Sequence, residues 1–292
     1  MYDNSEVVDS RQYRFGYKLQ ASSDVPEDFP VPIPVSEWRG AIFMPGETQE
    51  CWRASQYPPR IYILTTHALA VYSHPASTEA PFTIPLDKLI EVGAESALLY
   101  GALEFHGADA SRRFCYNAAH QRCIALFLRD VRSLWLPIYF SGTPLVSLPR
   151  PSEQAEFRCW YAMQAELDPE EHIYGSGLQP EREQEKRSWL PSKRNIMPAV
   201  LLTVTNHRMI TISSSKGATR DYYGVAMRYT SPASVSAVSV EKRVDGFELC
   251  IKLKSDQTWT LSFANESIAS ITPILALLKQ LSGLHGFAMR WK

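Results

Sequence analysis

Long hydrophobic runs are missing from this 292-residue sequence. The most apolar stretch is residues 124–140, IALFLRDVRSLWLPIYF. It is interrupted by Arg129, Asp130 and Arg132, so it does not form the ~18–20 apolar residues that a transmembrane helix needs. The first residues, MYDNSEVVDSRQ, lack the basic start and apolar core of a signal peptide. We therefore expect a soluble, cytoplasmic protein with no transmembrane segment.

An excess of charge of either sign is also missing. The chain has 30 lysines and arginines against 31 aspartates and glutamates, which gives a net charge of −1. Dedicated nucleic-acid binders need clustered positive charge. We therefore expect no nucleic-acid partner.

Cysteine is scarce, with five scattered residues, and a chain of this length does not need disulfides to be stable. We expect reduced thiols that pack as small hydrophobic residues. Cys115, His120 and Cys123 have a spacing that zinc sites use, but no fourth ligand is near them and both cysteines fit the apolar pattern. We therefore predict packing at these positions and no metal.

Known catalytic motifs are absent as well. The sequence has no glycine-rich phosphate loop, no Gly-x-Ser-x-Gly elbow and no His-Glu-x-x-His helix. We predict a protein that is not an enzyme, with no catalytic residue and no cofactor. An active site assembled from residues distant in sequence stays open as an alternative.

Proline is concentrated in two stretches, residues 25–35 and 136–151, where the missing backbone donors interrupt regular structure. Residues 11–20, RQYRFGYKLQ, alternate like a strand, so the first segment is either an extended lead-in or an arm that docks on the body. The prolines suggest four regions: an N-terminal arm at 1–35, a domain at 36–136, a Pro-rich linker with a bridging helix at 137–166, and a second domain at 167–292.

An internal repeat links the two domains. RIYILTTHALAVYS at 60–73 and AVLLTVTNHRMITIS at 199–213 each predict two apolar strands joined by a tight polar turn, at Thr66–His67 and at Asn206–His207. Further strands follow at 83–105 and 230–253.

Each repeat ends in an amphipathic segment that predicts a helix, at 118–135 and 265–283. In the second, we expect Asn265 to cap the start. Pro273 predicts either a kink or a later start with Thr272 as the cap. We therefore expect a mainly β (α+β) fold, with each repeat a bent antiparallel sheet covered by its C-terminal helix.

These motifs resemble the bacterial pleckstrin-homology-like (PH-like) domain family. The resemblance is carried by PGE at 45–47, LTTHALAVYS at 64–73 and FTIPLDKLIEV at 82–92, and covers about 44–135. The second copy, about 167–283, is more diverged: TSPASVSAV at 230–238 lacks the Ile-Pro-Leu pattern, and 179–195 are inserted. The resemblance implies tandem PH-like barrels and a binding role.

Two binding hypotheses follow. The first is a scaffold that binds another protein or assembles with itself, with Trp189 as a candidate anchor because it is the tryptophan in a polar insert. The alternative is recognition of an anionic lipid headgroup or small phosphorylated ligand by the second domain. Its candidate residues are His207, Arg208, Lys216 and Arg220, around the second hairpin.

Overall fold

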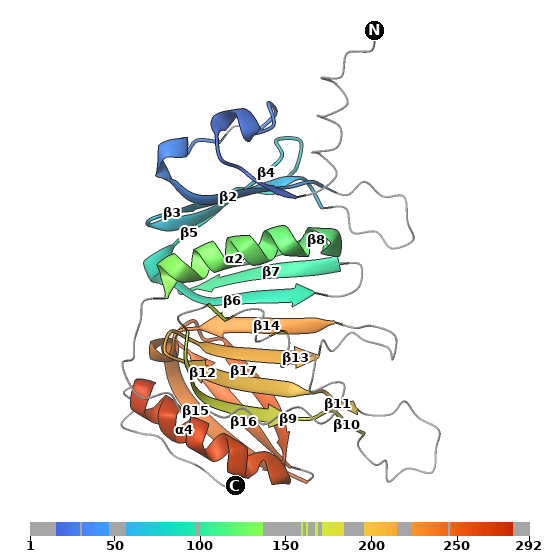
Figure 1. Ribbon diagram of the computed structural model, residues 1–292, viewed down its shortest axis with the longest axis vertical. Coiled ribbons are helices and arrows are strands. Elements are labelled where there is room, and N and C mark those ends of the chain that lie inside the picture. Colours follow the sequence, from blue (N-terminus) through green and yellow to red (C-terminus); the bar gives the residue numbers. More distant parts are fainter. Residues whose placement is uncertain are drawn as a thin grey trace. The chain divides into compact units, whose positions relative to one another are not determined.

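The computed structural model describes the following residues: 16–29, 31–46, 57–96, 100–136, 159, 162, 167–168, 171–183, 196–214, 224–244 and 246–282. These residues form antiparallel sheets and two helices of 15 residues each, so the prediction of a mainly β fold is confirmed (Figure 1). The chain divides into two compact units. Unit 1 holds Met1–Leu89 and Leu98–Pro137, and unit 2 holds Ile90–Ala97 and Ile138–Lys292.

Unit 1 contains a sheet in the order β1-β2-β3-β4-β5, an antiparallel pair β7–β8 and helix α2. The bounds are β1 Tyr17–Lys18, β2 Trp38–Met44, β3 Arg60–Thr65, β4 Ala68–Ser73, β5 Phe82–Pro85, β7 Tyr100–Gly107, β8 Ser111–Asn117 and α2 Gln121–Trp135.

Unit 2 contains strands β14, β13, β12 and β9 in that order, the sheet β15-β16-β17, the short pair β10–β11 and helix α4. The bounds are β9 Ile173–Gln179, β10 Arg182–Glu183, β11 Ile196–Met197, β12 Val200–Thr205, β13 Met209–Ser214, β14 Val225–Thr230, β15 Val235–Arg243, β16 Gly246–Leu253, β17 Thr258–Ala264 and α4 Ile268–Ser282. Strand β6, Leu89–Ser96, comes from the first half of the sequence but pairs with β14 over six residue pairs.

The predicted repeat is visible in the order of elements. Strands β2 to β5 are followed by a 3-10 turn at Leu86–Lys88, strands β6 to β8, a second 3-10 turn and α2. Apart from the inserted β10–β11 pair, strands β9 to β14 are followed in the same way by a 3-10 turn at Pro232–Ser234, strands β15 to β17, another 3-10 turn and α4. Both β2 and β9 have a register shift of one residue, opposite Thr65 and Thr205 respectively.

Both predicted hairpins are confirmed, and a threonine before each turn explains their geometry. The Thr65 Oγ1 atom accepts hydrogen bonds from the amides of His67 (3.2 Å) and Ala68 (2.9 Å). The Thr205 Oγ1 atom accepts them from His207 (3.2 Å) and Arg208 (3.0 Å). A side chain that mimics a turn carbonyl in this way fixes the loop locally.

The N-terminal segment from Gly16 docks on unit 1, which decides between the two alternatives drawn from its sequence. Tyr17 pairs with Phe43 and Lys18 with Ile42, so β1 extends the sheet at the edge of β2. The segment that follows covers one face of β2 and β3. It forms a small core with the following buried residues: Leu19, Phe29, Ala41, Phe43, Ile61 and Ile63.

The first predicted helix is confirmed at α2, preceded by a 3-10 turn that Asn117 caps by accepting the Ala119 amide (2.8 Å). The helix packs closely on β2 because Gly40 has no side chain: an added Cβ would lie 2.9 Å from Asp130 Oδ2. At its far end, the Trp135 indole N–H donates to the Leu89 carbonyl (2.8 Å). Among the described residues, no helix has both the length and the apolar character needed to span a membrane.

The second predicted helix is confirmed at α4, but its start differs from the expectation. The preceding 3-10 turn begins at Asn265, Ala264 occupies the N-cap position, and no side chain caps it. Asn265 therefore lies inside the turn and is not the cap. Pro273 lies within α4, and the Thr272 hydroxyl donates to the Ile268 carbonyl (2.8 Å), so Thr272 is not a cap either.

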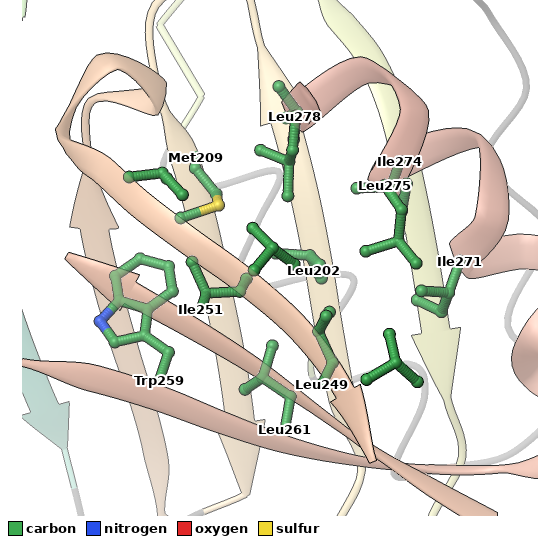
Figure 2. Packing of buried hydrophobic residues seen from close by; sticks show 14 of the residues in the cluster. Leu202, Met209, Leu249, Ile251, Trp259, Leu261, Ile271, Ile274, Leu275 and Leu278 are labelled. Carbon is green, nitrogen blue, oxygen red and sulfur yellow. The ribbon is translucent and has the colours of Figure 1, made fainter. Parts of the chain in front are cut away.

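Helix α4 closes the core of unit 2. Figure 2 shows the apolar face of the helix turned toward residues from β12, β13, β16 and β17. Trp259 is the largest fully buried side chain in the described residues and lies next to Ile251 and Met209 in this view. The residues labelled in the figure are Leu202, Met209, Leu249, Ile251, Trp259, Leu261, Ile271, Ile274, Leu275 and Leu278. Of the predicted bridging helix, the structure describes Cys159 and Ala162, both helical.

Candidate interaction site

The polar residues at the second hairpin form a buried internal network. The Arg208 and Glu171 side chains are each 1% exposed and form an ion pair between Arg208 Nη2 and Glu171 Oε2. Arg208 Nε also donates to Glu171 Oε1 (2.8 Å), and the Thr205 hydroxyl donates to the same oxygen (2.6 Å). The guanidinium carbon lies 5.3 Å from the centre of the Tyr229 ring. These contacts tie the segment before β9 to the β12–β13 turn.

This position changes the interpretation of Arg208. It was predicted to face an anionic ligand, whereas its charge is balanced by Glu171 inside the unit and its side chain is inaccessible to solvent. His207 is half-buried in the turn. Lys216, Arg220 and Trp189 lie outside the described residues. Of the four predicted ligand residues, the structure therefore describes His207 and Arg208, and headgroup recognition stays a prediction.

Two of the three residues with metal-like spacing, His120 and Cys123, have structural roles. The His120 Nδ1 atom accepts the Gly16 amide (2.9 Å), so this ring holds the arm. Burial raises the pKa of Cys123 to about 11, which keeps the thiol neutral and apolar at neutral pH. In the part of the chain that the structure describes, no three histidine, cysteine, aspartate or glutamate side chains are grouped so that they could hold a metal ion.

A groove in unit 1, between the arm and α2, is the candidate interaction site. It encloses about 280 Å³ and is lined by the arm, β2 and the first turns of α2. The lining is mainly apolar. The residues that line it are Gly16, Tyr17, Lys18, Ile42, Ala119, His120, Arg122, Cys123, Leu126, Phe127 and Asp130.

Leu126 is the exposed apolar residue of this groove. This residue is 51% exposed, although the inner face of α2 buries Ile124, Phe127 and Leu128 almost completely. Leu134, two turns later, is 41% exposed but does not line the groove. Single exposed leucines are ordinary on protein surfaces, so it is the position of Leu126 in a concave apolar lining that gives it interest.

Charged side chains surround this apolar lining. Lys18 Nζ and Asp130 Oδ2 form an ion pair at 3.2 Å with the two side chains 50% and 32% exposed. Arg122 is exposed on the first turn of α2. An apolar centre with a charged rim is the usual composition of a protein–protein contact. A volume near the lower limit of small-molecule pockets suits one bulky apolar side chain of a partner.

The groove could not be predicted from the sequence, because the N-terminal arm forms one of its walls. The alternating RQYRFGYKLQ pattern indicated a strand, but nothing local specified β2 as its partner or the first turns of α2 as its neighbour. Helical periodicity is the sequence signal that indicates an exposed apolar residue here, because Leu126 lies off the apolar face that Ile124, Leu128 and Val131 define.

A scan against protein-family models and a search of curated proteins both gave no match for this chain.

Proposed function

We propose that this protein is a non-enzymatic interaction protein, or scaffold, built from two tandem PH-like domains. The repeated element order supports this: four strands, a 3-10 turn, three strands, a second turn and a C-terminal helix occur twice. A bent antiparallel sheet covered by one helix is the architecture that the sequence resemblance implies. The resemblance also implies binding modules, since such folds present surfaces on a rigid framework.

We assign partner binding to the groove between the arm and α2. The observation that carries this assignment is the half-exposed Leu126 in a concave apolar lining of about 280 Å³. A bulky apolar side chain of the partner fills the groove, and an acidic residue beside it pairs with Arg122 on the rim. The expected partner is therefore a protein segment with an apolar anchor flanked by carboxylates.

Selection from a random peptide library displayed on phage tests this function. The full chain is the bait, and Leu126→Glu and Leu134→Glu are parallel baits. Both substitutions place a carboxylate on an exposed part of the same helix, but Leu126 alone of the two lines the groove. We expect wild type and Leu134→Glu to enrich peptides with an aromatic or large aliphatic residue next to Asp or Glu, and Leu126→Glu to lose them. Enrichment that is equal for all three baits, or absent, contradicts the assignment.

A further inference from the structure

Strand β6 of the first repeat pairs with β14 of the second, but the equivalent pairing of β15 with β5 is not present among the described residues. Strand β6 pairs with β14, and by element order β14 corresponds to β5 and β6 to β15. Each of β5 and β14 ends at a 3-10 turn that leads directly into the next strand. If each strand of the β6–β14 pair is replaced by its counterpart in the other repeat, the equivalent pairing joins β15 to β5. We consider this pairing between β15 of one chain and β5 of a second copy. Among the described residues, β5 is the outer strand of its sheet.

Hydrogen-bond alternation shows which amides of β14 meet β6. The Thr205 amide donates to the Arg208 carbonyl (2.8 Å), which sets the alternation along β12 and β13. Since alternate residues of an antiparallel strand direct their amides to opposite neighbours, Met227 and Tyr229 of β14 direct theirs to β6. Both residues have an N–H to donate, and they lie opposite Ala94 and Val92.

The outward positions of β5 follow from the same alternation. The Leu86 amide donates to the His67 carbonyl (2.8 Å), so Ile84 and Phe82 also direct their amides to β4. The outward positions are therefore Pro81, Thr83 and Pro85, and all three side chains are exposed. Two of the three lack an N–H, so Thr83 is left as the single outward donor at these positions.

By alignment of the two 3-10 turns, Pro81 corresponds to Met227 and Thr83 to Tyr229. Thr83 and Tyr229 both have an outward N–H, whereas Pro81 lacks the one that Met227 has, so the two repeats differ in outward donors at this position. Prolines on outer strands are a common protection against edge-to-edge association.

We propose that Pro81 and Pro85 prevent this chain from assembling head to tail with its own copies, by blocking the addition of β15 of one copy to β5 of the next. Such an assembly would be heterologous, so each chain added would present a further β5 or β15 edge until the assembly closes on itself. The two prolines limit strand addition to the β6–β14 pairing inside the chain. This inference does not depend on the groove or its partner.

The test is sedimentation velocity of the full chain over a range of concentrations, for wild type and for Pro81→Thr/Pro85→Thr. Threonine at positions 81 and 85 restores the two outward N–H donors, and position 83 between them is already a threonine. We expect the sedimentation coefficient of the double variant to rise with concentration well beyond that of wild type. A folded double variant that sediments like wild type at every concentration overturns the proposal.

A third substitution identifies the strand that adds. Arg243 and Gly246 flank a two-residue turn and form a hydrogen-bonded pair, so the amide of Lys242 points away from β16, to the edge of β15 that has no neighbouring strand among the described residues. The Lys242 side chain is exposed. Lys242→Pro in the double-variant background should therefore return sedimentation to the wild-type pattern. Assembly that persists with Lys242→Pro shows that another strand adds, and overturns the head-to-tail arrangement. If circular dichroism shows that the double variant is unfolded, the single variants Pro81→Thr and Pro85→Thr replace it, since each restores one donor.

Discussion

Glu171 and Arg208 are 37 residues apart in the sequence and form an ion pair in which each side chain is 1% exposed. The pair joins the segment before β9 to the start of β13. Removing one member of a buried pair is costly because the other charge is left without compensation inside the protein.

We therefore expect Arg208→Ala to lower the free energy of unfolding by about 3–5 kcal/mol. Urea denaturation measures this change. The control is the double variant Glu171→Leu/Arg208→Met, which removes both charges and keeps apolar volume, and which should be much closer to wild type. An Arg208→Ala variant as stable as wild type would show that the pair is not formed in solution.

Gly177 of β9 lies directly under α4, and this contact gives a second prediction. A Cβ atom there would lie 2.3 Å from Ile271 Cδ1 and 2.9 Å from Ile274 Cδ1. Gly177→Ala should therefore lower the free energy of unfolding by about 1–3 kcal/mol, because a methyl group is forced into a filled core. Gly175→Ala is the matched control on the same strand, since its added Cβ would be 3.4 Å from the nearest atom. Equal effects of the two substitutions would contradict the close packing of α4 on β9.

Local patterns predicted the hairpins and the helices well, for physical reasons that lie within each segment. The turn at Thr66–His67 follows from two apolar strands that flank polar residues, and Thr65 then fixes it through its own hydroxyl. Helix α2 follows from apolar spacing alone. Pro273 was ambiguous because its cost in a helix depends on whether packing offsets the missing hydrogen bond, and in α4 the flanking Ile271 and Ile274 are buried.

Pairings between distant segments could not be predicted in the same way. Strand β6 belongs by sequence to the first repeat, and no residue within it specifies β14 as a neighbour. Arg208 shows the same limit at the candidate site, since a basic residue at a hairpin looks like a ligand contact until Glu171 is placed beside it. The groove beside Leu126 likewise requires an arm that joins the sheet from far along the chain.

Glu104 makes the stability of unit 1 depend on pH. Its pKa is lowered from 4.5 to about 2, mainly by a hydrogen bond from His106 and also by Arg113, while burial acts in the opposite direction. Because the folded pKa is lower than the unfolded one, the carboxylate stabilises the fold fully above pH 4.5, and this contribution is lost as the pH falls toward about 2.

Urea denaturation of wild type and Glu104→Gln across this pH window measures the contribution of Glu104. We expect wild type to be the more stable protein above pH 4.5 and the difference to shrink steadily toward pH 2. A difference that stays constant over the whole window would mean that Glu104 has the same pKa in the folded and unfolded states.

The central claim is that the groove beside Leu126 binds the apolar anchor of a partner protein, and fluorescence anisotropy tests it most directly. The most enriched peptide from the library selection is labelled and titrated with wild type, Leu126→Glu and Leu134→Glu. We predict that Leu126→Glu weakens binding at least about tenfold, in line with loss of a central contact, and that Leu134→Glu leaves the Kd unchanged. Equal affinity for wild type and Leu126→Glu would contradict the account, because the peptide would then bind somewhere other than the groove.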